Sequence, residues 1–530
     1  MGKFVAAAIL AAALSTMPAP AKDSEPQSQW KGCGENETSG FSKFMVGPTK
    51  ARALTEKATP QDGIERCTTA LNALEQGASW QRRAALLRSR AKFLVRAKKH
   101  REALADLDAI KAIEQPDPVY TRSFGVSLHM LRAIAHLEAG RREDASSEAF
   151  EAMRLRPWSE RVAQFAYVVT ALRDKVPAGE GSLWSHLMLM DSGFGERRAI
   201  LLARAGDWKE AAVDWQQVKP APGEIGQTFI QIPNVTVQGA PGIPVRGVNV
   251  ARTIDAAMAA AMAGRGDLAD AWLNKLRESV NTPIESDKFA ERFGAKTDPK
   301  AQLEQLARWS GMIDIAKAAA DGDVEVAAAR LEAMREMPLS PTSLALIRTI
   351  VTKLPDGSHG GLRRAVAQIE EQMLLDRNER FVQKFQPDML LGDLPDHEEV
   401  MLANRYQNAV KFLRANGFSV KKAKDGKTAD VVFFGDKSLP LAIGEMALLR
   451  AAELCIEQGK TAFRVISSND YTQTVTSTMY GVEVGPTTVA GHSTQISIEF
   501  VATGAPGAID AAEIRGVLAP IYIASDTGKS

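Results

Sequence analysis

The sequence predicts a mainly α-helical protein, in which an irregular solenoid of helical hairpins precedes a small α+β C-terminal domain. Three observations predict this fold class. A turn motif followed by an alanine recurs between residues 98 and 327, and aromatic residues make up only 6% of the 530 residues. The last quarter of the chain alternates between strand-like and helix-like patterns. An alanine-rich chain with few aromatic residues favours close-packed helices over a β-sandwich.

The recurring motif is a glycine followed by Arg or Asp, with an alanine five residues after the glycine. Alanines allow two antiparallel helices to approach closely, and glycine permits a left-handed backbone at the turn between them. Small residues also recur seven positions before the turn. The motif occurs at Gly140–Ala145, Gly206–Ala211, Gly266–Ala271 and Gly322–Ala327, with a version lacking glycine at Lys98–Ala103. These small residues are Ala91, Ala133, Ala199 and Ala259, and Ile315 replaces the small residue in the last repeat.

This pattern resembles the tetratricopeptide repeat. Met130–Pro157 carries that family's Ala, Gly, Ala, Ala and Pro positions in order, and Leu87–Pro116 is the next most similar segment. The family's repeat is about 34 residues long. Here the motif alanines at 103, 145, 211, 271 and 327 are 42, 66, 60 and 56 residues apart. Extra helices or loops therefore lie between units, and a generic helical bundle with alanine-rich crossings is the alternative.

A basic stripe lies on the first helix of one predicted repeat. Arg88, Lys92 and Arg96 are spaced four residues apart and so share one helix face. The resemblance implies that such positions face a concave groove, where they could hold a carboxylate of a protein partner. A solvated basic face is the alternative interpretation.

The N-terminal residues predict a secretory signal peptide over residues 1–21. Lys3 precedes an apolar run from Phe4 to Leu14, and Ala19-Pro20-Ala21 forms an A-x-A site with cleavage expected after Ala21. The apolar run is too short to cross a bilayer, which needs about 20 residues. We therefore expect a periplasmic protein without a transmembrane segment. Residues 22–60 form a separate N-terminal segment.

The charge balance bears on partners. The formal net charge is +1, which argues against a nucleic acid partner and against polybasic attachment to a membrane. A protein or peptide partner in the envelope is expected, with the oligomeric state left open. Cys33 and Cys67 are predicted to form a disulfide if the chain is exported, and Cys455 to be a buried thiol. The three scattered cysteines exclude a paired-cysteine zinc site.

The repeat domain is predicted to span residues 61–380. It contains an insertion at Lys219–Val250, which holds five prolines and shows no helical periodicity. Phe229–Ile232 and Val235–Val237 resemble short extended pieces on either side of Pro233. The insertion is expected to be a long loop or a small hairpin, serving either as a binding arm or as a structural cap.

Residues 381–399 are predicted to be a linker, residues 400–520 an α+β domain, and residues 521–530 a tail. In the domain, Ala447–Leu454, Gly459 and Phe463 resemble a small envelope lipoprotein domain first noted in Caulobacter. That resemblance implies an envelope location and no known activity, and this chain lacks the lipid-bearing cysteine. Expected helices are Val400–Asn416, Leu441–Gln458 and Ala511–Leu518; expected strands are Ala429–Phe434, Ala462–Ser467, Thr472–Val484 and Thr494–Val501.

The motifs of the sequence predict no catalytic residue, cofactor or metal. Three G-K-[ST] sequences lack the glycine that a phosphate-binding loop needs five positions earlier, having Lys421, Leu454 and Ile523 there. Neither G-x-S-x-G nor H-E-x-x-H occurs. The expected function is that of a periplasmic interaction scaffold. The alternative is an envelope enzyme or ligand receptor with its site where the repeat and C-terminal domains meet.

Overall fold

The computed structural model describes most of the chain between residues 59 and 523. The signal peptide, nearly all of residues 22–60, most of the 381–399 linker and most of the helix expected at Val400–Asn416 lie outside the described residues. The described residues are 33, 59–74, 79–114, 120–170, 180–191, 194–217, 223–231, 236–245, 250–281, 299–334, 337–371, 391, 394, 406–408, 416–424, 426–436, 438, 440–475, 478–479, 482–483 and 488–523.

The predicted fold class is confirmed: the chain is mainly α-helical and carries a small C-terminal domain with a five-stranded antiparallel sheet. A first group of helices comprises α4 (Pro60–Asn72), α5 (Trp80–Arg96), α6 (His100–Ile113), the π-helical turn η2 (Thr121–Gly125), α8 (Val126–Glu138), α9 (Arg142–Leu155), α10 (Glu160–Thr170), the 3-10 turn η3 (Glu180–Trp184) and α11 (Ser185–Met190). A second group comprises α12 (Phe194–Ala205), α13 (Trp208–Gln217), α14 (Val250–Met262), α15 (Gly266–Asn281), α17 (Pro299–Ala320), α18 (Val324–Ala333) and α19 (Pro341–Lys353), and residues 360–371 are also helical.

The turns of the motif share one geometry. At each turn a residue with positive φ ends the first helix, and the amide of the next residue bonds to the carbonyl five positions earlier. This is the Schellman arrangement, which satisfies carbonyls at the end of the first helix. The turn residues are Lys98, Gly140, Gly206, Gly264 and Gly322. The corresponding bonds run from Lys99 to Leu94, Arg141 to His136, Asp207 to Leu202, Arg265 to Ala260 and Asp323 to Ala318, with N···O distances of 2.8–2.9 Å.

The third turn corrects the predicted register. The left-handed residue is Gly264, with φ +75°, whereas Gly266 is the first residue of α15. The equivalent alanine is therefore Ala269, which is fully buried, while Ala271 is exposed. The motif alanines then lie at 103, 145, 211, 269 and 327, so the last two spacings are both 58 residues. The segment Gly264–Asp267 contains two overlapping matches to the motif, one beginning at Gly264 and one at Gly266. Only the match that begins at Gly264 places a buried alanine, Ala269, where α14 and α15 pack.

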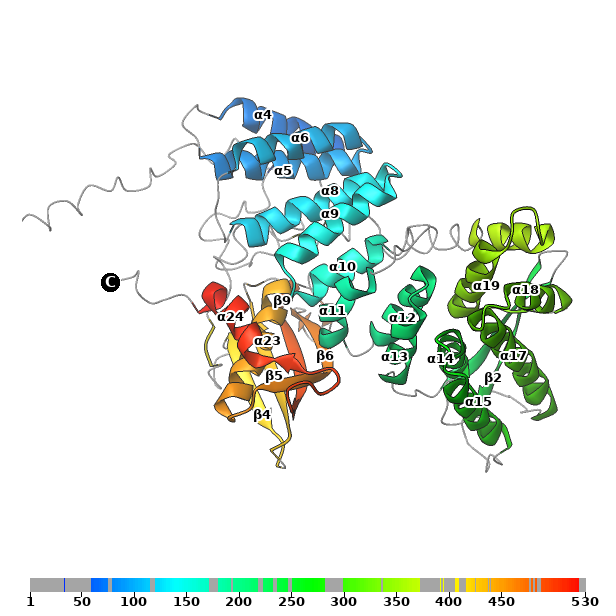
Figure 1. The fold of residues 1–530 in the computed structure, drawn as a ribbon. Helices are drawn as coiled ribbons and strands as arrows, with labels where there is room; N and C mark the ends of the chain where they lie inside the picture. The colour runs from blue at the N-terminus through cyan, green and yellow to red at the C-terminus, as the bar shows by residue number, and fades with distance from the viewer. Residues whose placement is uncertain are drawn as a thin grey trace, which may run out of the picture.

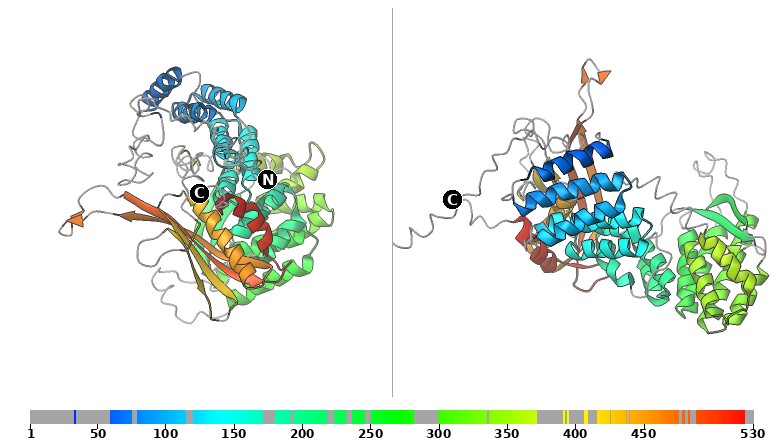
Figure 2. Two further views of the ribbon diagram at one scale, coloured as in Figure 1. Left: turned by 90° about the vertical axis from the view of Figure 1, so that its left-hand side faces the viewer. Right: turned by 90° about the horizontal axis from the view of Figure 1, so that it is seen from above.

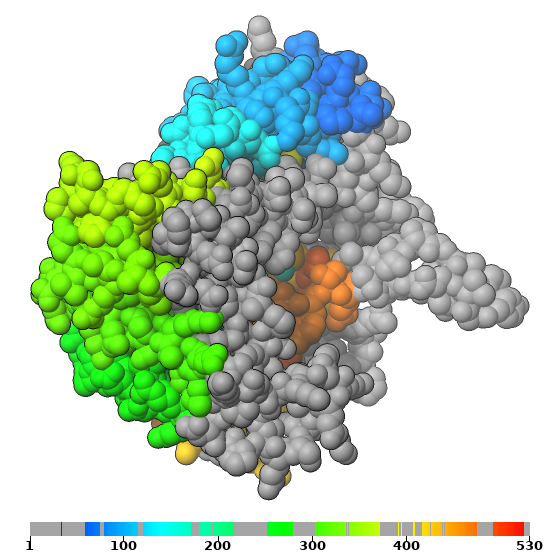
Figure 3. Space-filling model, turned by 90° about the vertical axis from the view of Figure 1, so that its right-hand side faces the viewer, coloured from blue at the N-terminus to red at the C-terminus, as the bar shows by residue number. Residues whose placement is uncertain are grey.

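Most of the described helices pack into two large hydrophobic cores. The first core joins α5 to α11, and the second joins α12 to α19. Helix α12 contributes to both, with Leu201 in the first and Leu202 in the second. Figure 1 shows the second group beside the first, connected through α12 and α13. In Figure 3 the second group (green) covers one side of the face shown, and the first helices (blue to cyan) lie above it.

The insertion at Lys219–Val250 forms a hairpin, which is one of the two structures expected from the sequence. Strands β1 (Gly223–Gln231) and β2 (Thr236–Val245) pair antiparallel, and β3 (Met337–Pro338) adds to the free edge of β1. Residue 337 comes from the segment between α18 and α19. The insertion is thereby connected through backbone hydrogen bonds to the second group of helices.

The C-terminal sheet has the strand order β10-β6-β9-β5-β4. Helices α23 (Pro440–Glu457) and α24 (Ala511–Tyr522) pack together, and α23 packs on β5, β6 and β9 of the sheet (Figure 2). The alternating burial of β5 places Val431 and Phe433 in the core. The strands are β4 (Gly417–Lys422), β5 (Thr428–Gly435), β6 (Ala462–Val475), β9 (Thr488–Val501) and β10 (Ile509–Asp510), with β7 (Thr478–Met479) and β8 (Val482–Glu483) pairing separately.

The expected helices Leu441–Gln458 and Ala511–Leu518 and the expected strand Ala429–Phe434 agree with α23, α24 and β5 within a few residues. The expected strand Thr472–Val484 is wrong, because its first residues complete β6 while β7 and β8 pair with each other. The expected helix Val400–Asn416 is not helical at its described residues 406–408, where Asn408 forms a β-bridge to Phe418. Gly459, with φ +66°, ends α23 as expected. Strand β6 continues to Val475 and β9 begins at Thr488, so the two form a long ribbon. Strand β4 was not predicted, and α24 extends past the predicted domain end at residue 520 to Tyr522. No helix within the described ranges is long and apolar enough to cross a membrane.

Candidate functional site

The two groups of helices, α4 to α11 and α12 to α19, are together called the helical array. Where the first group meets the C-terminal domain, each buries side chains in the core of the other. Trp158, between α9 and α10, and Met190, at the end of α11, are buried in the core of the C-terminal domain. In the opposite direction, Leu441 of α23 is buried in the core of the first helical group. Because each side buries apolar side chains in the other, this contact is part of the folded core.

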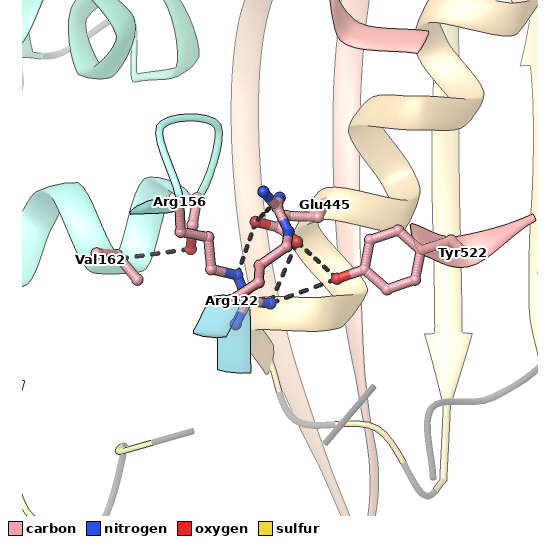
Figure 4. A network of polar contacts seen from close by, with 6 residues as sticks. Arg122, Arg156, Val162, Glu445 and Tyr522 are labelled. Carbon is pink, nitrogen blue, oxygen red and sulfur yellow. Dashed lines mark hydrogen bonds and ion pairs between the residues drawn. The ribbon is translucent and has the colours of Figure 1, made fainter. Parts of the chain in front are cut away.

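A buried ion-pair network lies at this junction (Figure 4). The Nε atom of Arg156 donates to Oε1 of Glu445 at 2.8 Å, and its Nη2 atom donates to Oε2 at 3.2 Å. Arg122 Nη2 also donates to Oε1, at 3.1 Å. The hydroxyl of Tyr522 donates to Oε2 at 2.6 Å. The side chains of Arg156 and Glu445 are both 0% exposed, so water does not compensate either charge.

Local structure places each of these side chains. Arg156 ends α9 immediately before Pro157, which cannot continue a helix. Arg122 lies in the π-helical turn η2, a type of helical irregularity that is frequent at functional sites. Glu445 lies one turn into α23, and Tyr522 is the last residue of α24. The network therefore joins two segments of the helical array to both helices of the C-terminal domain.

The two arginines determine the charge of Glu445. Burial opposes ionisation of this carboxyl, but the positive charges of Arg156 and Arg122 and the bonds from Arg156 and Tyr522 outweigh it and lower its pKa to about 2. Glu445 is therefore ionised at neutral pH.

Next to this network is a recess of about 410 Å³, a volume that includes its open mouth. It lies between the start of α10, the end of α11, the start of α23, and strands β6 and β9. Apolar side chains line one part of it: Trp158, Met190, Leu448, Val465 and Ile496. Polar side chains line another part: Glu160, Arg161, Ser468, Asp470 and Thr494.

The polar groups of the recess are connected across the junction. Ser468 of β6 donates to Oε2 of Glu160 at 3.0 Å. Arg161 donates to Oδ2 of Asp470 from Nε at 3.0 Å and from Nη2 at 2.7 Å. Thr494 donates to Oδ1 of Asp470 at 2.6 Å. The first turn of α10 thus supplies one carboxylate and one cation to the recess, where they bond to side chains of β6.

Glu160 is the titrating group of this recess. Burial raises its pKa to about 7, the carboxylates of Asp191 and Asp470 add to the increase, and the bond from Ser468 and the charge of Arg161 oppose it. Such a carboxyl can gain or lose a proton near neutral pH, which is a property of both binding and catalytic sites. Across the described ranges, no group of three or more His, Cys, Asp or Glu side chains could hold a metal ion.

The structure separates the three residues of the predicted basic stripe. Arg88 is buried, with 2% of its surface exposed. Its Nε donates to the hydroxyl of Ser127 at 2.6 Å, and its guanidinium lies over the ring of Phe124. Its Nη2 atom also reaches the carbonyl of Leu394, which belongs to the predicted linker. Arg88 is therefore not part of a solvated face, whereas Lys92 and Arg96 are half-buried.

The predicted linker is in part a packed element. Leu391 and Leu394 are both buried in the core of the first helical group. The resemblance to the tetratricopeptide repeat implies that a partner binds beside Arg88. In the structure, Leu394 of this chain lies there instead.

The structure joins Cys33 and Cys67 by a disulfide. Cys67 lies in α4 and packs in a small cluster with Ala70, Leu86 and Phe93. The disulfide ties a residue of the N-terminal segment to the first hairpin. Cys455 is a buried free thiol in α23, and burial raises its pKa to about 11.

The sequence does not predict the residues of the junction, although it does allow a site where the two domains meet. One local signal was present. Glu445 is on the same helical face as Leu448, Ala452 and Cys455, all of which are buried. A single carboxylate on an apolar helical face needs a buried partner, but the sequence does not show that the partner is Arg156, 289 residues away.

Comparisons with known protein families, with curated proteins and with solved structures found no match for this chain.

Proposed function

We propose that this chain is an interaction scaffold of the bacterial cell envelope, which binds a protein partner through the joined surface of its helical array and C-terminal domain. The observation that carries the proposal is the buried pair of Arg156 and Glu445. A domain held by shared cores and a buried ion pair presents a fixed composite surface to a partner. Such preorganisation lowers the entropic cost of binding.

The repeated hairpins support the same proposal. Helical hairpins that share one turn geometry stack into extended surfaces, which repeat proteins use for binding. The envelope location rests on the predicted signal peptide, and the disulfide is consistent with an oxidising compartment. The tetratricopeptide character of the hairpins is likewise proposed from the turn motif.

A second function has a specific observation in its favour. The recess at the junction contains convergent polar groups and a glutamate with a pKa near 7, so a ligand receptor or an enzyme with its site there is the alternative. No side chain of the recess forms a nucleophile-and-base arrangement of the Ser–His or Cys–His type among its lining residues. The recess therefore supports a binding role more directly than a catalytic one.

Site-specific photo-crosslinking in the native envelope tests the proposal. A photo-reactive residue replaces Tyr471 of β6 or Leu183 of η3, which are the two test positions near the junction. In the control, the same photo-reactive residue replaces Val326 of α18. The three side chains are similarly exposed, at 51%, 46% and 45%. A scaffold yields the same envelope protein from both junction positions, identified by mass spectrometry. Recovery of only a small molecule, or of unrelated proteins that are equally recovered at Val326, would contradict it.

A further inference from the structure

The side-chain hydrogen bonds that the carboxylate of Glu160 accepts come from neutral groups. Gln164 donates to its Oε1 at 2.8 Å, and Ser468 donates to its Oε2 at 3.0 Å. Among the residues that the structure describes, no cation forms an ion pair with it. The neighbouring Arg161 directs two of its nitrogens to Asp470 instead. Glu160 is thus a half-buried acid in a recess without a cation of its own.

Glu160 is the lining carboxylate of the recess that has no ion pair within the described residues, since Asp470 pairs with Arg161. The carboxylates of Asp191 and Asp470 act on Glu160 in the same direction, and Arg161 is the cation that opposes them. Glu445 also lines the recess, but Arg156 and Arg122 compensate its charge. The N-termini of α10 and α23 both point here and would favour an anion. The full charge of ionised Glu160 outweighs these partial charges of the helix ends, so the recess attracts a cation when Glu160 is ionised.

The remaining wall is apolar. Trp158 and Met190 from the array meet Leu448, Val465 and Ile496 from the C-terminal domain. A ligand that matches both walls carries a short aliphatic chain with a positive charge at its end.

We propose that the junction recess binds a lysine side chain of the partner protein, with the methylene groups against the apolar wall and the ammonium group at Glu160. An ammonium is a compact charge with three donors, which suits two carboxylate oxygens that each already accept one bond. The proposal rests on the proposed scaffold function, because the partner supplies the lysine.

Two small probes that differ in one group test the recess directly. Nα-acetyl-lysine methylamide carries the ammonium, and Nα-acetyl-norleucine methylamide has an apolar side chain instead. Chemical-shift titration of the full chain at pH 8 is expected to show saturable binding of the lysine probe, at least about tenfold tighter than binding of the norleucine probe. Glu160→Gln keeps the shape and removes the charge, so it weakens the lysine probe by about tenfold, the ratio expected for one charged hydrogen bond. Glu151→Gln on α9, away from the recess, leaves binding unchanged.

The pH dependence of binding provides a second readout. Glu160 must be ionised to hold an ammonium, and the groups that face it are Asp191, Asp470 and Arg161, with Ser468 and Gln164 as neutral donors. A lysine ammonium stays charged to about pH 10. The affinity for the lysine probe therefore rises between pH 6 and pH 8 in the unmodified chain and stays level in Glu160→Gln.

Equal binding of the two probes, unchanged affinity in Glu160→Gln, or no saturable binding would overturn the lysine proposal. These results are separable from failure of the scaffold function. Crosslinking of one partner by both the unmodified chain and Glu160→Gln would keep the scaffold and reject the lysine site. Selective binding of the lysine probe without any crosslinked protein would support the recess and reject the scaffold.

Discussion

Arg156 and Glu445 form a fully buried ion pair, with the Nε and Oε1 atoms 2.8 Å apart, between residues that are 289 positions apart in the chain. The pair connects the end of α9 with the first turns of α23. Since neither side chain contacts water, each charge depends on the other and on Arg122 and Tyr522. Removal of one partner leaves an uncompensated charge in a nonpolar environment, which proteins tolerate poorly.

Glu445→Gln is therefore expected to lower the free energy of unfolding by about 3–5 kcal/mol, the cost of leaving a buried charge without its partner. Urea denaturation measures this change. Glu151→Gln applies the same substitution to an exposed pair with Arg154 and is expected to cost less than about 1 kcal/mol. The double variant Arg156→Met with Glu445→Leu should lose less than the sum of its single variants. A cost for Glu445→Gln no larger than that of the control contradicts a structural role for the pair.

The raised pKa of Asp255, in α14, is expected to make the stability of the fold depend on pH. Burial raises the pKa of Asp255 to about 7, and the charge of Glu196 adds to the increase. The hydrogen bond that Asp255 accepts from Ser340 lowers the pKa and so opposes these two effects. Between pH 4 and pH 7 the folded chain holds a proton that the unfolded chain has released, so stability falls as the pH rises and then levels off. Asp255→Asn removes this contribution. Its stability relative to the unmodified chain should rise by about 4 kcal/mol between pH 4 and pH 8.

Thermal or urea denaturation of both proteins across this pH range measures the difference. Comparison of the two cancels the similar contributions of Asp214 and Glu160, whose pKa values are also raised. Asp321→Asn changes an exposed aspartate at the end of α17 and serves as the control. A difference between Asp255→Asn and the unmodified chain that does not vary with pH would show that Asp255 ionises normally.

Local patterns predicted the elements well because the information is local. Pro157 ends α9 and Gly459 ends α23 through backbone restrictions that act within a few residues. The alternation of Ile496 and Ile498 predicted the inner face of β9. The register of the third hairpin was mistaken because Gly264 and Gly266 both fit the motif, and only packing against α14 distinguishes them.

The candidate site depends on long-range packing, which a single sequence does not show. The helical spacing of Arg88 predicts a solvated or partner-binding face. Its burial results from contacts with Ser127 of α8 and Leu394 of the predicted linker, both far from it in the chain. The division of the repeat domain into two cores has the same origin, since α12 resembles its neighbours in composition but contacts both cores.

The disulfide between Cys33 and Cys67 determines how many thiols react in the folded, the denatured and the reduced chain. The folded chain should expose none, because Cys455 is buried. Denaturation without a reductant should release one thiol, and denaturation with a reductant should release all three cysteines. Cys67→Ala is expected to lower stability by about 2–4 kcal/mol through loss of the cross-link. Three thiols in denaturant without a reductant, from protein isolated from the envelope, would show that the bond does not form there.

The register of the third hairpin can be tested by two substitutions that are two residues apart. Ala269 is fully buried in the core formed with α14, whereas Ala271 is exposed on α15. Ala269→Leu inserts three carbon atoms into a packed helix crossing and is expected to cost about 1–3 kcal/mol. Ala271→Leu is the matched control, and surface substitutions of this kind change stability by less than about 0.5 kcal/mol. Urea denaturation of both variants measures the order. A larger loss for Ala271→Leu would restore the motif that begins at Gly266 and reject the turn at Gly264.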